Sequence, residues 1–125
     1  MNIASKIAAG IPALLLVLLG FAWWVAPDFV TAQLCMTLQR GAGLSTQIGD
    51  LASFFITLGA CVLIALMSGN RLWFYPAIML LTFAIVGRWI AWLFHGAELT
   101  VGIIAVETAL VGLLLLVSAS FKQRR

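Results

Sequence analysis

The chain has 125 residues, of which 64% are hydrophobic and only 9% charged, and its formal net charge is +3. Its mean hydropathy of +1.16 excludes an ordinary soluble domain, because so few charged residues cannot solvate a folded surface. Each membrane span takes roughly 20 residues, so we expect residues 1–125 to form a single integral membrane domain of about four spans.

The first apolar segment is expected to span the membrane from about residue 7 to residue 26. Lys6 precedes it, as in a secretory signal, but the segment is long for such a signal and ends in two bulky tryptophans without a small-residue cleavage site. We therefore interpret it as a retained span. Pro27 follows, and proline discourages continuation of the helix.

The connection from Pro27 to Thr46 is too long for a tight turn. Its sequence PDFVTAQLCMTLQR has one roughly apolar face and one polar face, which predicts a short amphipathic helix in the outer interface between the first two spans. The flexible sequence GAGLST would follow it. A packed loop that caps the bundle is the alternative. The apolar face would hold Phe29, Ala32, Cys35, Met36 and Leu38, and the polar positions are Thr31, Gln33 and Gln39.

Three more apolar segments follow, over about residues 47–68, 72–94 and 98–121. The turn sequence SGNR closes the first of them, and Gly96 suits the C-terminus of the second. The last ends in the basic tail KQRR, and Glu98 is expected at its start, where the helix dipole favours an acidic residue. Four spans and three connections predict an all-α membrane protein, a four-transmembrane-helix bundle. Glycines that allow close helix approach recur at Gly20, Gly49, Gly59, Gly87, Gly102 and Gly112.

Basic residues fall mainly on one side of this topology, which places both termini in the cytoplasm by the positive-inside rule. That side receives Lys6, Arg71, Lys122, Arg124 and Arg125, and the other receives Arg40 with Asp28 and Glu98. Tryptophans are expected mainly as membrane anchors: Trp23, Trp24, Trp89 and Trp92 in an outer belt, with Trp73 and Tyr75 in an inner one.

Three ionisable residues are expected within the outer half of the bilayer. Asp50 and Arg88 lie roughly one and two turns below the outer ends of their spans, and Glu107 lies on the order of 13 Å deep. A lone charge at a helix centre costs about 2.5–3.5 kcal/mol on insertion scales, so these side chains should face the bundle interior or a wet cavity. Arg88 can offer a planar fork to either carboxylate.

Helical spacing places further residues beside these charges. Asp50, Ser53, Phe54 and Thr57 share one stripe, Arg88 shares another with Trp92 and His95, and Thr100 shares a third with Glu107. If the stripes face inward, they form a polar pocket that opens outward, with Phe54 and Trp92 as apolar walls. The alternative is a set of ion pairs that only fixes helix register. His95 alone is also explained as a solvated or loop-bonding residue.

The sequence does not favour an enzyme. It has no H-E-x-x-H, G-x-S-x-G, C-x-x-C or phosphate-binding glycine loop, although a carboxylate pair could support acid–base chemistry. A single histidine disfavours a bis-histidine haem or a histidine-rich metal centre, so no metal or cofactor is expected. Cys35 and Cys61 are interpreted as small apolar fillers. The basic tail is explained by topology and lipid contact, and nucleic acid is not implied.

The sequences GDLASFFITLGACVLIAL, GRWIAWLFHG and AVETALVGLLLLVS resemble a family of small four-span bacterial membrane proteins of unknown function, broadly similar to the DoxX-like group. The resemblance covers roughly residues 45–118, and it is carried by Gly49, Asp50, Arg88, His95, Gly96 and Glu107. It implies a four-helix bundle in the bacterial cytoplasmic (inner) membrane and no established activity. Some DoxX-like proteins are associated with quinone-linked sulfur oxidation, but no motif here carries that activity across.

Two functions are therefore expected from the sequence. In the first, the chain binds or transports a small or lipid-like ligand at the pocket of Asp50, Arg88 and Glu107. The carboxylates would receive a cation, proton or polar headgroup, and Arg88 would hold one carboxylate or contact an anionic group of the ligand. In the second, the chain is an accessory or assembly subunit of a larger membrane complex, and the three residues are structural ion pairs. The expected partners are the lipid bilayer, a lipid or small-molecule ligand, and a second copy or a membrane-complex subunit.

Overall fold

The computed structural model describes residues 2–121, and over that range the secondary structure is entirely helical. As the sequence predicts, four helices are long and apolar enough to cross a membrane. The second of these runs without a break through three consecutive elements, and a 3₁₀ turn precedes the third. The elements are α1 (Ile3–Val25), α2 (Pro27–Gln33), α3 (Ala42–Thr46), the π-helical turn η1 (Gln47–Leu51), α4 (Ala52–Ser68), the 3₁₀ turn η2 (Arg71–Trp73), α5 (Phe74–Phe94) and α6 (Val101–Ser120).

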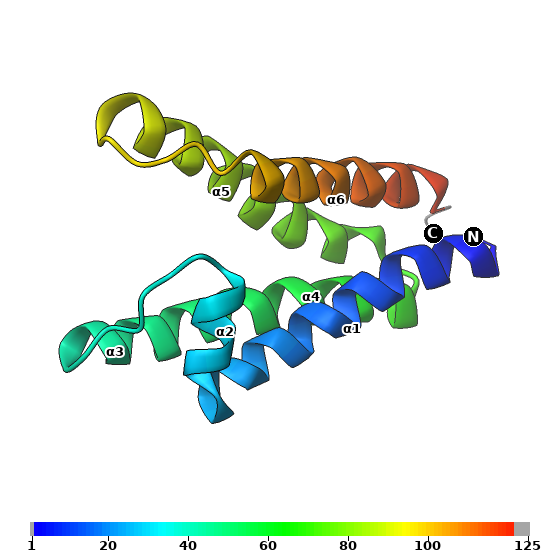
Figure 1. The fold of residues 1–125 in the computed structure, drawn as a ribbon. Coiled ribbons are helices and arrows are strands. Elements are labelled where there is room, and N and C mark those ends of the chain that lie inside the picture. Colours follow the sequence, from blue (N-terminus) through cyan, green and yellow to red (C-terminus); the bar gives the residue numbers. More distant parts are fainter. Residues whose placement is uncertain (1, 122–125) are drawn as a thin grey trace.

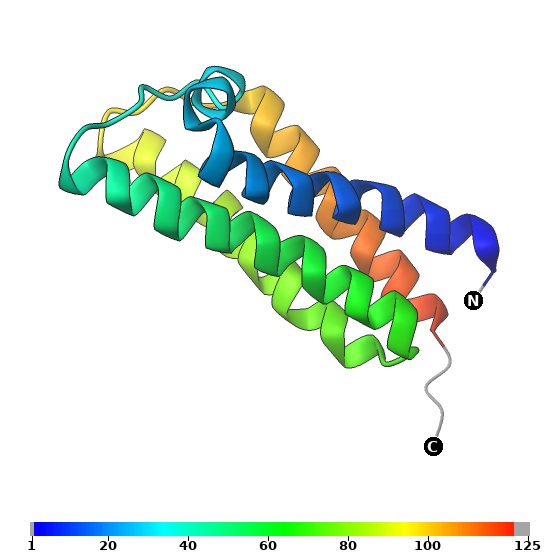
Figure 2. The ribbon, with the colours of Figure 1, turned by 90° about the horizontal axis from the view of Figure 1, so that it is seen from below.

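The long helices form two antiparallel pairs, α1 with α4 and α5 with α6 (Figure 1). The two pairs approach each other at the end where α1 begins and α6 finishes, and they diverge toward the end that holds α2 and α3. Figure 2 shows the same arrangement from below, with the start of α1 and the finish of α6 again at one end. The end where the pairs lie close together is called the closed end below, and the end where they lie apart is called the open end.

Two glycines set the close contact between α1 and α4. A Cβ atom at Gly59 would collide with the carbonyl oxygen of Ala13 and would lie 3.0 Å from the backbone nitrogen of Val17. A Cβ atom at Gly20 would lie 2.9 Å from the backbone nitrogen of Ile56. Such small residues let helix backbones approach directly in a membrane. The other four glycines predicted for helix approach (Gly49, Gly87, Gly102 and Gly112) have open space where a Cβ atom would stand.

The main hydrophobic core occupies the closed end of the molecule. Leu58 and Leu81 are buried there between the two helix pairs, and the rings of Phe74 and Phe121 meet edge to face with centroids 5.2 Å apart. The outward faces of the same helices are apolar as well: Met67 is 86% exposed and Leu116 is 73% exposed. This distribution is typical of helices whose solvent is lipid rather than water.

Trp23 does not belong to the exposed outer belt that the sequence predicts. It is fully buried, in a small cluster with Val30 of α2 and Ala52 of α4, whereas the adjacent Trp24 is 56% exposed. The helix α2 turns back over the end of α1 and covers Trp23, which the sequence pattern did not indicate. The indole N–H of Trp23 has no hydrogen-bond partner among the described residues.

The connection between the first two spans differs from the predicted amphipathic helix. The helix α2 ends at Gln33, and its buried residues are Val30 and Thr31, whereas Phe29 is 60% exposed. The chain then turns at Cys35, whose φ of 58° ends the regular structure. The sequence GAGLST, predicted to be flexible, is largely helical because α3 continues into η1 and α4.

Gln47 holds this connection in place. Its side-chain amide donates to the carbonyl oxygen of Thr37 (3.1 Å), and its side-chain oxygen accepts from the backbone N–H of Gln39 (2.8 Å). These bonds satisfy backbone groups of a segment that makes no helix of its own. Residues 34–39 therefore lie across the open end of the molecule in a defined position.

Other boundaries follow local chemistry. Gly69 and Gly96 have φ values of 71° and 72° and terminate α4 and α5, as the sequence predicts, because glycine enters the left-handed region without strain. The start of the fourth helix differs from the prediction. Glu98 lies in a non-helical segment, and α6 begins at Val101, so Glu98 does not sit in its first turn.

Candidate functional site

Arg88 of α5 and Glu107 of α6 form an ion pair across the α5–α6 contact. The Nη2 atom of Arg88 donates to Oε1 of Glu107 at 2.9 Å, and the Nε atom lies 3.1 Å from Oε1 and 3.2 Å from Oε2. This side-on arrangement uses two donor atoms on one edge of the guanidinium, a geometry that lysine cannot reproduce. Within residues 2–121 it is the one salt bridge found between side chains.

The two partners differ in exposure. The side chain of Glu107 is 11% exposed and that of Arg88 is 34% exposed. Both carboxylate oxygens accept from Arg88, whereas the Nη1 atom has no acceptor among the described residues. The more accessible side chain of the pair is therefore that of Arg88, and its guanidinium has hydrogen-bond donors left over.

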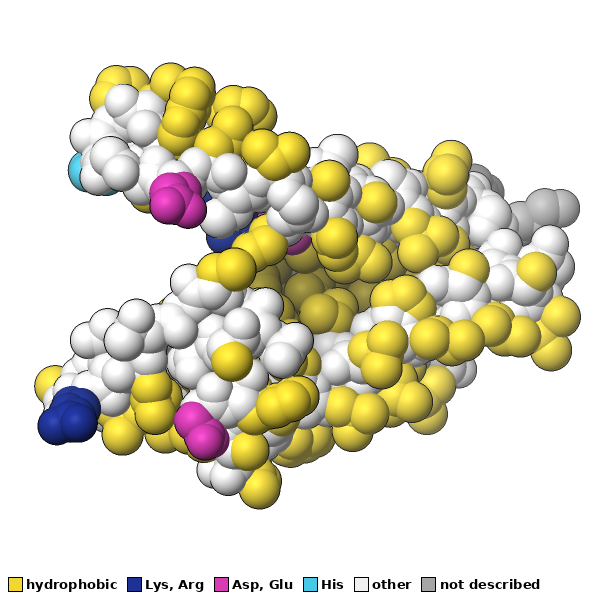
Figure 3. All heavy atoms as spheres, in the orientation of Figure 1, with side chains coloured by type: hydrophobic (Ala, Val, Ile, Leu, Met, Phe, Trp, Pro, Cys, Tyr) yellow, Lys and Arg dark blue, Asp and Glu magenta, His cyan; other side chains and the backbone are white. Residues whose placement is uncertain are grey.

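The ion pair forms part of the wall of a cavity of about 420 Å³ between the two helix pairs. Figure 3 shows the hollow between these pairs, with hydrophobic side chains over much of its floor. Apart from the ion pair, the lining is apolar except for the Thr100 hydroxyl and the Cys35 thiol. The remaining lining residues are Leu34, Met36, Leu51, Phe54, Phe55, Ala84 and Ile103.

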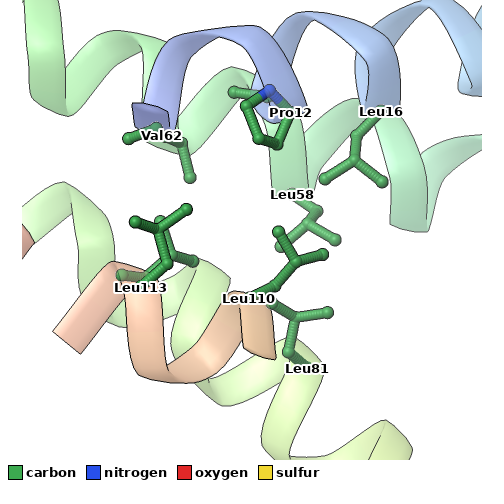
Figure 4. Close-up of a pocket in the computed structure, with 10 residues that line it drawn as sticks. Pro12, Leu16, Leu58, Val62, Leu81, Leu110 and Leu113 are labelled. Atoms are coloured by element: carbon green, nitrogen blue, oxygen red, sulfur yellow. The ribbon is translucent and has the colours of Figure 1, made fainter. Parts of the chain in front are cut away.

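Toward the closed end, apolar side chains fill the space between the helix pairs. Leu58, Leu81 and Leu110 point toward one another there, and the gap that remains is about 10 Å³ (Figure 4). A gap of this size is about that of a single water-sized probe, and its apolar lining offers no hydrogen bonds to a water. Among residues 2–121, apolar side chains therefore occupy the space between the helix pairs on the closed-end side of the cavity.

The structure does not bring Asp50 to the pair. Asp50 lies in η1 and is exposed, and it does not line the cavity. Ser53 and Thr57 are exposed as well, and Ser53 donates to the backbone carbonyl of Gly49 at 2.7 Å. The close α1–α4 contact at Gly59 fixes the rotation of α4, so that this polar stripe faces away from the cavity. Of the predicted stripe, Phe54 alone lies in the wall.

Trp92 and His95 also lie outside the cavity. Trp92 is 43% exposed and contacts Trp89 edge to face, with ring centroids 5.9 Å apart. His95 is exposed at the C-terminal cap of α5. Their spacing puts them on the same side of α5 as Arg88, but neither lines the cavity.

Several lining residues were not expected from the sequence. Leu34, Cys35 and Met36 come from the connection, whose position across the open end depends on the hydrogen bonds of Gln47. Ala84 has no polar side chain that would mark it as a site residue, but its spacing of four residues from Arg88 puts it on the same helix face. Thr100, which helical spacing predicts on the face of Glu107, lines the cavity together with it.

The described residues contain no group of three or more histidine, cysteine, aspartate and glutamate side chains placed to hold a metal ion. Comparison with known protein families, curated proteins and solved structures finds no match for this chain. The geometry of the cavity and of the ion pair is therefore the basis on which a function can be inferred.

Proposed function

We propose that this chain is a multi-pass protein of the bacterial cytoplasmic membrane that binds a small lipid-like ligand in the cavity between its two helix pairs. Both termini lie in the cytoplasm, and the cavity lies in the outer half of the bilayer. The five-to-one distribution of basic residues supports this orientation. The apolar outward faces of the four long helices support the membrane location.

The position of Arg88 is the observation that supports this proposal most directly. Arg88 is paired with Glu107 and also forms part of a cavity wall that is largely apolar. Ionisable residues within a bilayer mark functional sites by default. The volume of about 420 Å³ lies within the range of roughly 300–1,000 Å³ that is usual for small-molecule sites. An amphiphile fits this lining, because its polar head can reach Arg88 while its chain contacts Phe54 and Phe55.

Filling the cavity tests this proposal. In Ala84→Trp the added indole occupies the cavity, so photolabelling by a diazirine-bearing fatty acid in the native membrane is expected to fall at least about fivefold at cavity residues. Val86→Trp is the matched control, because Val86 lies on the same helix, is 47% exposed and does not line the cavity. Labelling that is spread evenly over the outward faces and is equal in all three proteins would count against a binding site.

The two cysteines test the orientation. Cys35 is an exposed free thiol at the open end, and Cys61 is a buried free thiol. A membrane-impermeant maleimide that reaches the outer face of the cytoplasmic membrane in intact cells is therefore expected to modify Cys35 and spare Cys61, as read by peptide mass spectrometry. Cys35→Ser gives the background. Modification of Cys35 only after the membrane is broken would reverse the orientation.

A second candidate function is that of a subunit in a larger membrane complex. It is favoured by the exposed stripe of Asp50, Ser53 and Thr57, because a carboxylate on a membrane helix is stabilised by a partner rather than by lipid. In this case Arg88 and Glu107 would act as a structural ion pair, and the contact would lie on α4 and not in the cavity.

A further inference from the structure

Arg88 has hydrogen-bond donors without an acceptor in residues 2–121, and these indicate the charge of the ligand head. A guanidinium carries five N–H groups in a rigid plane. Glu107 accepts from the Nε–H and from one N–H of Nη2, which leaves three N–H groups without an acceptor in the described part of the chain. Buried or partly buried donors of a charged group are stabilised strongly by an acceptor, and most strongly by an anionic one.

The cavity offers little to a cation. Glu107 is the one acidic residue in the described lining, and both of its oxygens already accept from Arg88. Asp50 and Glu98 are exposed and do not line the cavity. The sequence-based hypothesis that Asp50 and Glu107 receive a cation, proton or polar headgroup therefore lacks one of its two carboxylates in the cavity, and its other part, an anionic ligand group at Arg88, is the part that the lining favours.

Resting on the function proposed above, we infer that the cavity takes an amphiphile whose head is an oxyanion, either a carboxylate or a phosphate. The head oxygens accept from the free edge of the Arg88 guanidinium, and the hydroxyl of Thr100 lies in the same lining. The chain of the amphiphile packs against Leu51, Phe54 and Ile103. Arg88 thus lies between two anions, Glu107 and the ligand.

This arrangement gives the two partners opposite effects on binding. Loss of Arg88 removes the donors and should abolish the preference for an anion. Loss of the negative charge on Glu107 removes a like charge from the vicinity of the ligand and frees donors of Arg88, so it should strengthen anion binding. An ion pair that only holds α5 to α6 predicts instead that both substitutions weaken binding together.

The test is displacement of tritiated palmitate from the purified full-length protein in a maltoside detergent, with palmitate, hexadecyl phosphate and hexadecanol as competitors of equal chain length. Wild type is expected to prefer one of the two anions to hexadecanol by at least about tenfold, which corresponds to about 1.4 kcal/mol. The better anion identifies the head as a carboxylate or a phosphate. Arg88→Gln should reduce the preference to about one, and Glu107→Gln should raise anion affinity by about threefold or more.

Arg88→Lys keeps the charge without the planar fork and provides a second variant if Glu107→Gln does not fold. It should retain some preference for the anion but less than wild type. If neither palmitate nor hexadecyl phosphate binds wild type more tightly than hexadecanol, the oxyanion inference is overturned and the binding function is left intact. Anion binding lost to the same extent in Glu107→Gln and Arg88→Gln would also overturn it. Binding of none of the three amphiphiles would overturn the proposed function itself.

Discussion

Replacement of Gly59 by leucine is expected to prevent α1 and α4 from packing and to destabilise the protein by at least about 3 kcal/mol, the upper end of the usual cost of overpacking. The new side chain would start at a Cβ atom that collides with the Ala13 carbonyl oxygen and lies 2.6 Å from Cγ2 of Val17. A flexible side chain could move aside, but a backbone carbonyl on a helix cannot. The two helices would therefore have to separate along much of their contact.

The matched control is Gly112→Leu, because a Cβ atom at Gly112 meets nothing within 4 Å. Both variants exchange a helical glycine for a better helix former, so the difference between them isolates packing. The measurement is the monodisperse fraction and thermal unfolding midpoint of each protein in mild detergent. Gly59→Leu should be largely aggregated or strongly destabilised, and Gly112→Leu should resemble wild type. Similar behaviour of the two variants would mean that the α1–α4 contact is not as close as described.

The number of long helices could be predicted from the sequence because length and hydropathy alone determine it. Two of the helix ends were also predictable, since glycine at Gly69 and Gly96 has a local conformational reason. The helix that contains the second predicted span begins before residue 47, because α3 and η1 extend α4 backward to Ala42. No local signal in GAGLST distinguishes a flexible loop from the first turn of a helix.

Rotation of a helix about its axis was harder to predict than its ends. In a chain that is apolar on all sides, a few polar residues are the only guide to the inner face. For α4 the polar residues do not mark the inner face. Ser53 and Thr57 are exposed, and the α1–α4 contact is made at Gly59. The position of a residue along the span was sufficient to suggest Glu107 as a partner for Arg88, but it could not separate Glu107 from Asp50.

The tertiary contacts of the connection between the first two long helices could not be predicted from the sequence either. The burial of Trp23 under Val30 follows from the return of α2 over α1, and the place of Cys35 in the cavity wall follows from the hydrogen bonds of Gln47. Neither is encoded in the periodicity of the segment. The cavity is thus built partly from residues that have no recognisable pattern.

Replacement of Arg88 by glutamine is expected to abolish binding of the proposed amphiphile in the cavity. Glutamine is shorter, carries no charge and has two N–H donors where the guanidinium has five, so it can satisfy neither Glu107 nor an anionic head fully. The carboxylate of Glu107, which is 11% exposed, would lose its charged partner and would itself repel an anion. Loss of charge-assisted bonds of this kind costs about 1.5–3 kcal/mol each, which corresponds to a drop in occupancy of tenfold or more below saturation.

The most direct measurement is native mass spectrometry of the protein extracted gently from its own membrane, on wild type, Arg88→Gln and the control Arg40→Gln, whose arginine is exposed and outside the cavity lining. One bound amphiphile of defined mass is expected on wild type and on Arg40→Gln, and it should be lost from Arg88→Gln. A binding site at Arg88 would be contradicted if all three proteins retained the amphiphile equally. It would also be contradicted if none of them carried a small molecule and all three carried a protein partner. The second of those results would assign the chain to a membrane complex.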